Sequence, residues 1–188
     1  MNRRKAIGGI LAFTGLGIAS YSGVKFFYGK SNRGQLRNYL NLISELVDVI
    51  IPPTETPGAK EAKVQNYIID FMESCSSKKE YNNFLNGLND LQDTCLNSYN
   101  ANFEDCTMNQ KIEVLENLDS NYDSNGLLAK IDNKIRGRSF FNILKSLTIE
   151  GYCTSELGAT KLLAYVPVPV NYNAIITIEP NQKAWATR

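Results

Sequence analysis

The chain has 188 residues, of which 43% are hydrophobic and 21% are charged, and its formal net charge is +1. This length and composition suit one folded domain with an ordinary hydrophobic core. Lysine and arginine are scattered through the sequence, so the basic stripe that neutralises phosphates is missing and nucleic-acid binding is not expected.

The chain contains no histidine, which excludes several classes of catalytic and metal site. Imidazole is the usual general base near neutral pH and the commonest metal ligand, so Ser-His-Asp, Cys-His and histidine–zinc sites are excluded. The four cysteines stand at positions 75, 95, 106 and 153, without Cys-x-x-Cys spacing. This argues against an iron–sulfur cluster, an all-cysteine zinc site and a haem attachment, so we expect no cofactor or metal bound by this chain.

The N-terminus has the layout of an export signal. Arg3 and Arg4 stand in a basic cluster, and no charged residue follows between Ala6 and Val24. Paired arginines before a mildly apolar, glycine-rich run resemble the twin-arginine translocation signal. We predict a twin-arginine-like signal peptide or anchor over residues 1–24. An ordinary secretory signal and an uncleaved membrane anchor remain alternatives, and cleavage after Ala19 is the expected site.

Apolar periodicity predicts that residues 32–188 form one compact all-α domain of about five to seven helices. The first helix carries apolar residues at steps of three and four, namely Leu36, Leu40, Ile43, Val47 and Ile50, and Pro52-Pro53 must end it. Thr56 and Pro57 predict the N-cap and first turn of a second helix, which leaves "IPPTETPGAK" as a tight corner.

Two capping patterns predict the next helices. Ser77 and Glu80 precede one apolar run, and Thr107 and Gln110 precede another. The polar stretch between them, "SYNANFEDC", is expected to be a solvated loop. A further helical pattern starts near Gly126.

The last helical pattern resumes after Gly137, with Phe140, Phe141, Leu144 and Leu147 on one face. It ends after Leu163. Prolines then alternate with valines up to Pro169, and "NAIITIEP" is rich in β-branched residues. The C-terminal tail is therefore predicted to be extended or to form a short edge piece.

Two segments are not required by helix packing alone, Ile50 to Val64 and Arg138 to Pro169. With them, most of the chain from Leu36 to the tail, including Trp185, resembles the gluconate 2-dehydrogenase subunit 3 family. The resemblance implies a small accessory subunit without redox chemistry. Its partner would be a catalytic flavoprotein of the glucose-methanol-choline oxidoreductase class that carries FAD, and a cytochrome c subunit would take the electrons.

The resemblance also implies a role in assembly, stabilisation and co-export. The small subunit would present Arg3 and Arg4 to the twin-arginine translocase on behalf of a larger partner that lacks a signal. We accordingly expect a periplasmic protein, associated with the inner membrane through its complex or through an uncleaved N-terminal anchor. The other hypotheses are a free-standing periplasmic ligand- or cofactor-binding helical protein and an enzyme that uses carboxylates and tyrosines.

The same two segments supply the predicted partner-binding surface, because glycines allow close backbone approach, tyrosines offer rigid contact area and prolines stiffen the chain. The residues assigned to it are Pro53, Thr56, Pro57, Gly58, Glu150, Gly151, Tyr152, Thr154, Ser155, Gly158, Thr160, Tyr165, Pro167 and Pro169. The alternative is that these residues form an internal crossing of core helices, and both roles can coexist.

Two catalytic interpretations of this region are rejected. Gly158 precedes Ala-Thr-Lys, but the Gly-Lys-Ser/Thr of a phosphate loop and its preceding strand are missing. Glu150 and Glu156 are six residues apart and point to different sides of a helix. Glu156 is instead expected in a first helical turn behind a Thr154 or Ser155 cap.

The four cysteines are expected to include at least one disulfide. An exported protein matures where disulfides persist, so four free thiols are not expected. Cys95 and Cys106 flank a short loop and are predicted to pair, whereas Cys75 lies at the far end of the helix that carries Cys95. Cys153 is either a buried core thiol or an intersubunit bond to the flavin subunit.

Overall fold

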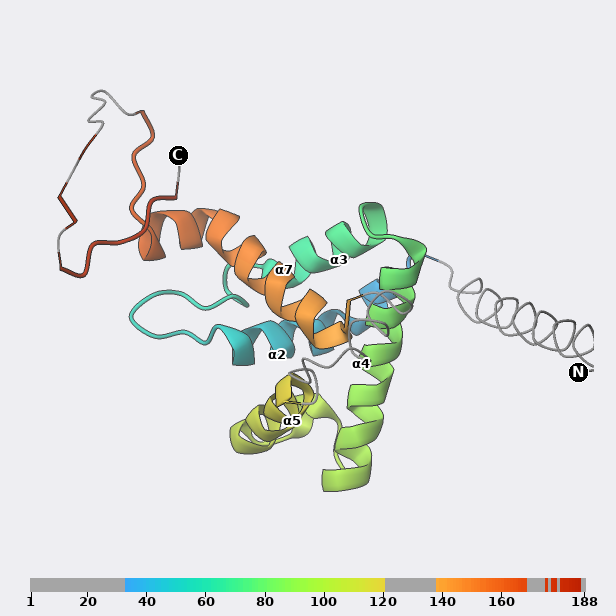
Figure 1. Ribbon diagram of the computed structural model, residues 1–188. Helices are drawn as coiled ribbons and strands as arrows, with labels where there is room; N and C mark the ends of the chain where they lie inside the picture. The colour runs from blue at the N-terminus through green and yellow to red at the C-terminus, as the bar shows by residue number, and fades with distance from the viewer. Residues whose placement is uncertain (1–32, 121–137, 169–174, 176, 179, 187–188) are drawn as a thin grey trace, which may run out of the picture.

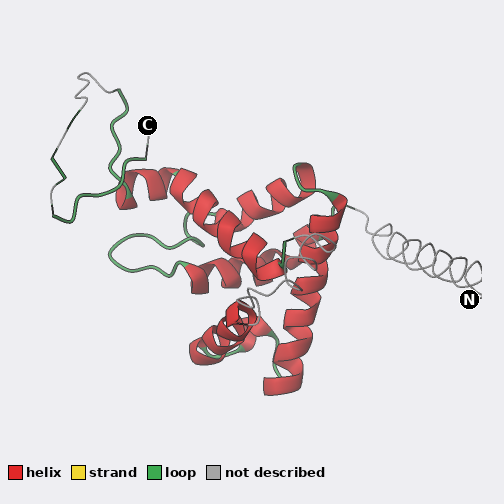
Figure 2. Ribbon diagram, viewed as in Figure 1, coloured by secondary structure: helices red, strands yellow, loops and turns green. Residues whose placement is uncertain are grey.

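A computed structural model describes residues 33–120, 138–168, 175, 177–178 and 180–186 (Figure 1). These residues form helices and loops without a strand, which confirms the all-α prediction (Figure 2). The predicted signal at 1–24 and the helical pattern near Gly126 lie outside the described residues. Among the described helices, none has the length and apolar character of a membrane span.

Helix α7 occupies the centre of the domain, where it packs against α3 and α4 and also contacts α2 and α5 (Figure 1). In chain order the elements are η1 (Leu36–Tyr39), α2 (Leu40–Ile50), α3 (Val64–Ser74), α4 (Lys78–Tyr99), η2 (Phe103–Asp105), α5 (Met108–Ser120), α7 (Phe140–Thr154) and η3 (Gly158–Leu162). The first predicted helix is confirmed as η1 followed by α2, which ends just before Pro52-Pro53.

The predicted start of the second helix is wrong, because α3 begins at Val64 and not at Pro57. Residues 51–63 form a loop and turns instead of a tight corner. The backbone N–H of Ala59 donates to the carbonyl of Ile51 at 2.9 Å, which returns the chain to the end of α2. Lys63 then takes a left-handed conformation with φ 59°, and this interrupts any helix that approaches from the N-terminal side.

Both capping predictions are confirmed. The Ser77 hydroxyl accepts from the Glu80 N–H at 3.2 Å, and the Glu80 carboxylate accepts from the Ser77 N–H at 3.4 Å, which completes a capping box at the start of α4. Before α5, the Thr107 N–H donates to the Gln110 side chain at 2.9 Å. Each pair supplies a partner for backbone groups that the helix itself leaves unpaired.

The loop between α4 and α5 differs from the solvated loop that we expected, because Phe103 in η2 is fully buried. The side chain of Gln92 on α4 holds this turn in place. Its oxygen accepts from the Phe103 N–H at 2.9 Å, and its amide nitrogen donates to Glu104 at 2.7 Å. The segment is mostly polar in sequence, but its one phenylalanine, Phe103, packs into the core.

The crossing of α4 and α7 depends on Gly87. A Cβ atom at this position would collide with the side chain of Phe140, the first residue of α7. The rings of Phe140 and Phe84 lie 5.3 Å apart between centroids, a spacing typical of aromatic pairs. The absence of a side chain at residue 87 therefore lets α7 approach α4 closely enough for these rings to pack.

A cluster of charged side chains connects α2, α5 and the turn before α3. Glu45 on α2 pairs with Lys111 on α5 at 2.7 Å and with Lys60 in the turn before α3 at 2.6 Å. The Lys111 side chain is only 8% exposed, and its ammonium also lies 5.5 Å from the ring centroid of Phe103. Hydrogen bonds from Lys111 and then Lys60 lower the pKa of Glu45.

The Gly87 contact predicts that Gly87→Ala lowers the free energy of unfolding by roughly 1–3 kcal/mol, because the new methyl group overpacks the helix crossing. Asn86→Ala is the matched control, since this neighbour is exposed and the substitution also raises helix propensity. Urea unfolding measures both. A Gly87→Ala protein as stable as the control would contradict the close approach of α4 and α7.

The Glu45 cluster predicts a loss of stability in acid. Because the folded-state pKa of Glu45 is lowered, its contribution is complete above the unfolded-state pKa and is lost as pH falls through the folded-state pKa. Glu45→Gln should therefore be less stable than the parent at neutral pH, and the difference should shrink below about pH 4.

Unfolding midpoints across this pH range measure the effect. The control is Asp70→Asn, which removes the exposed pair of Arg37 and Asp70 and should change stability little. A difference between Glu45→Gln and the parent that stays constant with pH would argue against the linkage.

Candidate partner-binding site

The two segments that stand out in the sequence meet inside the fold. Tyr152 on α7 is 1% exposed, and its hydroxyl donates a hydrogen bond to the carbonyl of Pro57 in the loop after α2. Burying a tyrosine requires a partner for its hydroxyl, and this carbonyl supplies one. The contact fastens the loop at 51–63 to the C-terminal half of α7.

Glycines make this meeting sterically possible. A Cβ at Gly151 would lie 2.6 Å from the Tyr67 ring on α3, and one at Gly58 would lie 2.8 Å from the backbone nitrogen of Pro53. At Gly158 a Cβ would overlap the carbonyl oxygen of Tyr152. Close backbone approach, which we expected of Gly151 and Gly158, is therefore what these residues provide.

Part of the predicted partner surface is buried within this chain. Tyr152, Gly58, Gly151 and Gly158 are buried within this chain, so they form the internal helix crossing that was the alternative. An aromatic side chain between glycines suits a core crossing and an interface equally well. Only the packing of α3 on α7 distinguishes the two.

For the remaining residues of the predicted surface, partner binding stays a prediction. Those that are exposed are Pro53, Glu150, Thr154, Thr160, Tyr165 and Pro167, and those that are half-buried are Thr56, Pro57 and Ser155. Pro169 lies outside the described residues. The structure brings the Pro57 and Ser155 regions together around Tyr152, whereas Tyr165 and Pro167 lie beyond η3.

Several polar groups of this surface serve the helix ends. The Ser155 hydroxyl accepts from the Gly158 N–H at 3.0 Å and donates to the Tyr152 carbonyl at 2.7 Å, which identifies Ser155 as the cap behind Glu156. The Thr154 hydroxyl instead donates to the carbonyl of Glu150. These hydroxyls are thus occupied by the backbone of their own chain.

Glu150 interacts with α3 across the crossing. Burial, followed by the hydrogen bond to Glu150 and the charge of its carboxylate, raises the pKa of Tyr67. The phenol therefore stays protonated near neutral pH. This arrangement joins the two helices.

The C-terminal tail exposes more apolar surface than any other part of the described chain. Among the described residues twelve large hydrophobic side chains are exposed, of which six lie in the tail and Leu162 ends the preceding η3. We call these seven the tail surface: Leu162, Tyr165, Val166, Val168, Ile175, Ile178 and Trp185. Exposed apolar side chains gathered in one region mark interaction sites. Figure 1 shows the tail and the loop after α2 projecting from the same side of the helical body.

A backbone bridge holds the described part of the tail together, and the Lys183 ammonium also donates to the Lys161 carbonyl at 2.8 Å. Ala164 pairs with Trp185 in a parallel sense, where the Ala164 N–H donates to Ala184 at 2.8 Å and the Ala186 N–H donates to Ala164 at 2.9 Å. The sequence predicted an extended tail, and its β-branched residues without a partner strand were the signal of exposure. Of the tail surface, only Tyr165 was among the residues that we assigned to partner binding.

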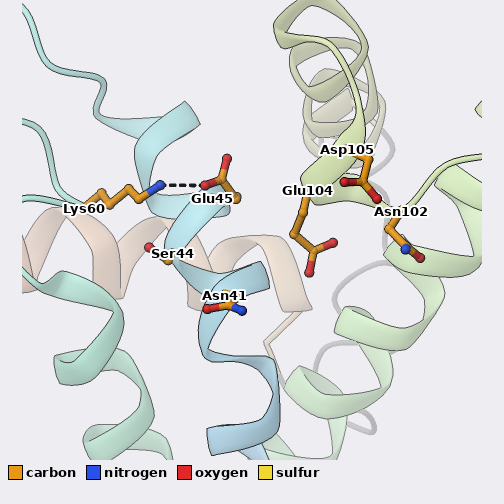
Figure 3. Close-up of a pocket in the computed structure, with 7 residues that line it drawn as sticks. All are labelled: Asn41, Ser44, Glu45, Lys60, Asn102, Glu104 and Asp105. Carbon is orange, nitrogen blue, oxygen red and sulfur yellow. Dashed lines mark hydrogen bonds and ion pairs between the residues drawn. The ribbon is translucent and has the colours of Figure 1, made fainter.

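A polar cleft of about 410 Å³, which the sequence did not predict, separates α2 from η2 (Figure 3). Its lining residues are Asn41, Ser44, Glu45, Lys60, Asn102, Glu104 and Asp105. Two of its carboxylates are already engaged, since Glu45 pairs with lysines and Glu104 accepts from Gln92. Among the described residues, no group of three or more potential ligands could hold a metal ion.

The four cysteines are thiols in this structure. Cys75 is exposed, Cys153 is half-buried, and Cys95 and Cys106 are buried next to each other. Both are free thiols here, and the predicted disulfide between Cys95 and Cys106 stays a prediction. The intersubunit role of Cys153 remains a prediction.

The comparison with protein families identifies this architecture. The model of the family described as gluconate 2-dehydrogenase subunit 3 matches residues 38–170, which include α3, α7 and the loop that Tyr152 fastens. No curated protein and no solved structure matches the chain significantly. Since the match spans most of the sequence, the chain belongs to the gluconate 2-dehydrogenase subunit 3 family, which is named for a subunit of a larger dehydrogenase.

Proposed function

We propose that this chain is the non-catalytic small subunit of an exported flavin-dependent dehydrogenase that oxidises gluconate, a sugar or a polyol. It binds and stabilises a catalytic flavoprotein of the glucose-methanol-choline oxidoreductase class, which carries FAD. Family membership supports the association with other subunits. The lack of histidine and the internal pairing of Glu45, Glu104 and Glu150 support a role without catalysis.

The tail surface is the observation that carries this proposal. Val168 is 70% exposed, Ile175 is 93% exposed and Ile178 is 82% exposed. Each apolar side chain that leaves water on docking contributes roughly 25 cal/mol for every Å² buried. A large protein partner can cover such a projecting segment, whereas a small ligand cannot.

The polar cleft does not favour the alternative of a free-standing ligand-binding protein. Ligand pockets are lined mostly by apolar and aromatic side chains, with a few polar groups that orient the ligand. The cleft residues in Figure 3 are polar or charged, and the Lys60 ammonium points to Glu45. The cleft therefore lacks the apolar and aromatic side chains that usually line a ligand pocket.

Export extends the proposal to the partner. The paired Arg3 and Arg4 would address this subunit, and any flavoprotein bound to it, to the twin-arginine translocase. The complex would then reside in the periplasm, held at the inner membrane by its other subunits or by an uncleaved N-terminal anchor. A cytochrome c subunit would accept the electrons from the flavin.

The tail surface predicts that Val168→Asp and Ile178→Asp each weaken binding to the catalytic flavoprotein by roughly tenfold or more, because a charge would be desolvated at the interface. The measurement is the amount of flavoprotein that co-purifies from co-expressing cells. Leu96→Asp is the matched control, since Leu96 is 44% exposed but lies on α4. Equal recovery with all three variants would contradict docking through the tail.

The export signal predicts that replacing both Arg3 and Arg4 by lysine retains this subunit and its flavoprotein in the cytoplasm. The substitution keeps the charge, so a secretory signal that reads charge alone would still work. Lys5→Arg is the control with the pair intact. Cell fractionation and immunoblotting measure both proteins, and normal periplasmic delivery by the double variant would exclude the twin-arginine route.

A further inference from the structure

Two thiols meet between α4 and the turn that follows it. Cys95 lies on the inner face of α4 and is fully buried, and Cys106 follows η2 with 8% exposure. Gln92, three residues before Cys95, accepts from the N–H of Phe103, three residues before Cys106, so the two cysteines lie at the same contact between α4 and η2. Asn100, in a left-handed conformation with φ 54°, ends α4 and reverses the chain so that Cys106 returns to the helix.

Contacts that do not involve sulfur hold this arrangement. Phe103 is anchored in the core, and the Gln92 side chain bonds to both Phe103 and Glu104. The Cys106 N–H donates to the Phe103 carbonyl at 3.2 Å. The folded chain therefore presents the two thiols to each other before any bond forms, which removes most of the conformational cost of joining them.

We propose that Cys95 and Cys106 are a disulfide-forming pair, which a disulfide oxidant such as oxidised glutathione closes within the folded domain. The Cys106 thiolate attacks one glutathione sulfur and releases the first glutathione thiolate. The Cys95 thiolate then attacks the Cys106 sulfur and releases the second. Two protein thiols lose two protons and two electrons, one sulfur–sulfur bond forms, and the oxidant becomes two thiols.

The surroundings of the two cysteines decide which thiol reacts first with the oxidant. Cys106 is 8% exposed whereas Cys95 is fully buried, so the oxidant reaches Cys106 first. Burial above all, and then Cys106 and Glu104, raise the pKa of Cys95 to about 11. Since the thiolate is the nucleophile, ring closure should be slow at neutral pH and should accelerate as pH rises. This inference does not depend on the proposed partner or on export.

The test uses the full chain with Cys75→Ser and Cys153→Ser, so that only the pair remains. After oxidised glutathione is added, intact-protein mass spectrometry should show the loss of two hydrogens, no retained glutathione and no alkylatable thiol. Peptide mapping should connect residue 95 to residue 106. Two thiols that stay alkylatable, or a stable glutathione adduct, would overturn the proposal.

A second variant and a second measurement separate proximity from general reactivity. Cys95→Ala in the same background should keep glutathione on Cys106 or stay unmodified, and should never lose two hydrogens. Alanine is chosen because serine would bury an unpaired hydroxyl. The oxidised pair should also raise the midpoint of thermal unfolding by roughly 6–12 °C, since it restrains the unfolded chain. An unchanged or lower midpoint would show that the bond distorts the fold and that the pair is not pre-positioned.

Discussion

The packing of α7 against two helices at once is the constraint on which the rest of the domain depends. Both crossings are too close for a side chain, and glycine stands at each of them, Gly87 facing Phe140 and Gly151 facing Tyr67. With α7 at this depth, Tyr152 reaches the loop after α2 and binds the Pro57 carbonyl. One steric condition thus positions the helices, the loop and the tail that follows α7.

This arrangement also divides the molecule into a closed part and an open part. The crossing buries the tyrosine and the glycines that would otherwise suit an interface, and Glu150 interacts there with Tyr67. In the polar cleft, Glu45 pairs with lysines and Glu104 accepts from Gln92. Apolar surface without such partners gathers in the tail. An accessory subunit with no chemistry of its own needs only such an exposed surface, and this is the physical basis of the proposed function.

Local signals in the sequence predicted most helices correctly, but they did not predict how distant segments pack against one another. The apolar spacing of α2 and α7, the capping box of α4 and the contact of Thr107 with Gln110 before α5 involve residues close together in the chain, so the sequence alone predicts them. The start of α3 was misplaced because a bond from Ala59 to Ile51 and a left-handed Lys63 decide it. The burial of Tyr152 and the polar cleft depend on segments far apart in the chain, which no local pattern reports.

The bridge between Ala164 and Trp185 bears on the thermodynamics of association. It joins the two ends of the segment that carries half of the exposed large hydrophobic side chains among the described residues, so the entropy of closing that loop is lost when the free subunit folds. A partner that covers the segment need not supply this part of the ordering free energy, and more of the burial energy appears as affinity. The bridge would then strengthen the complex without touching the partner.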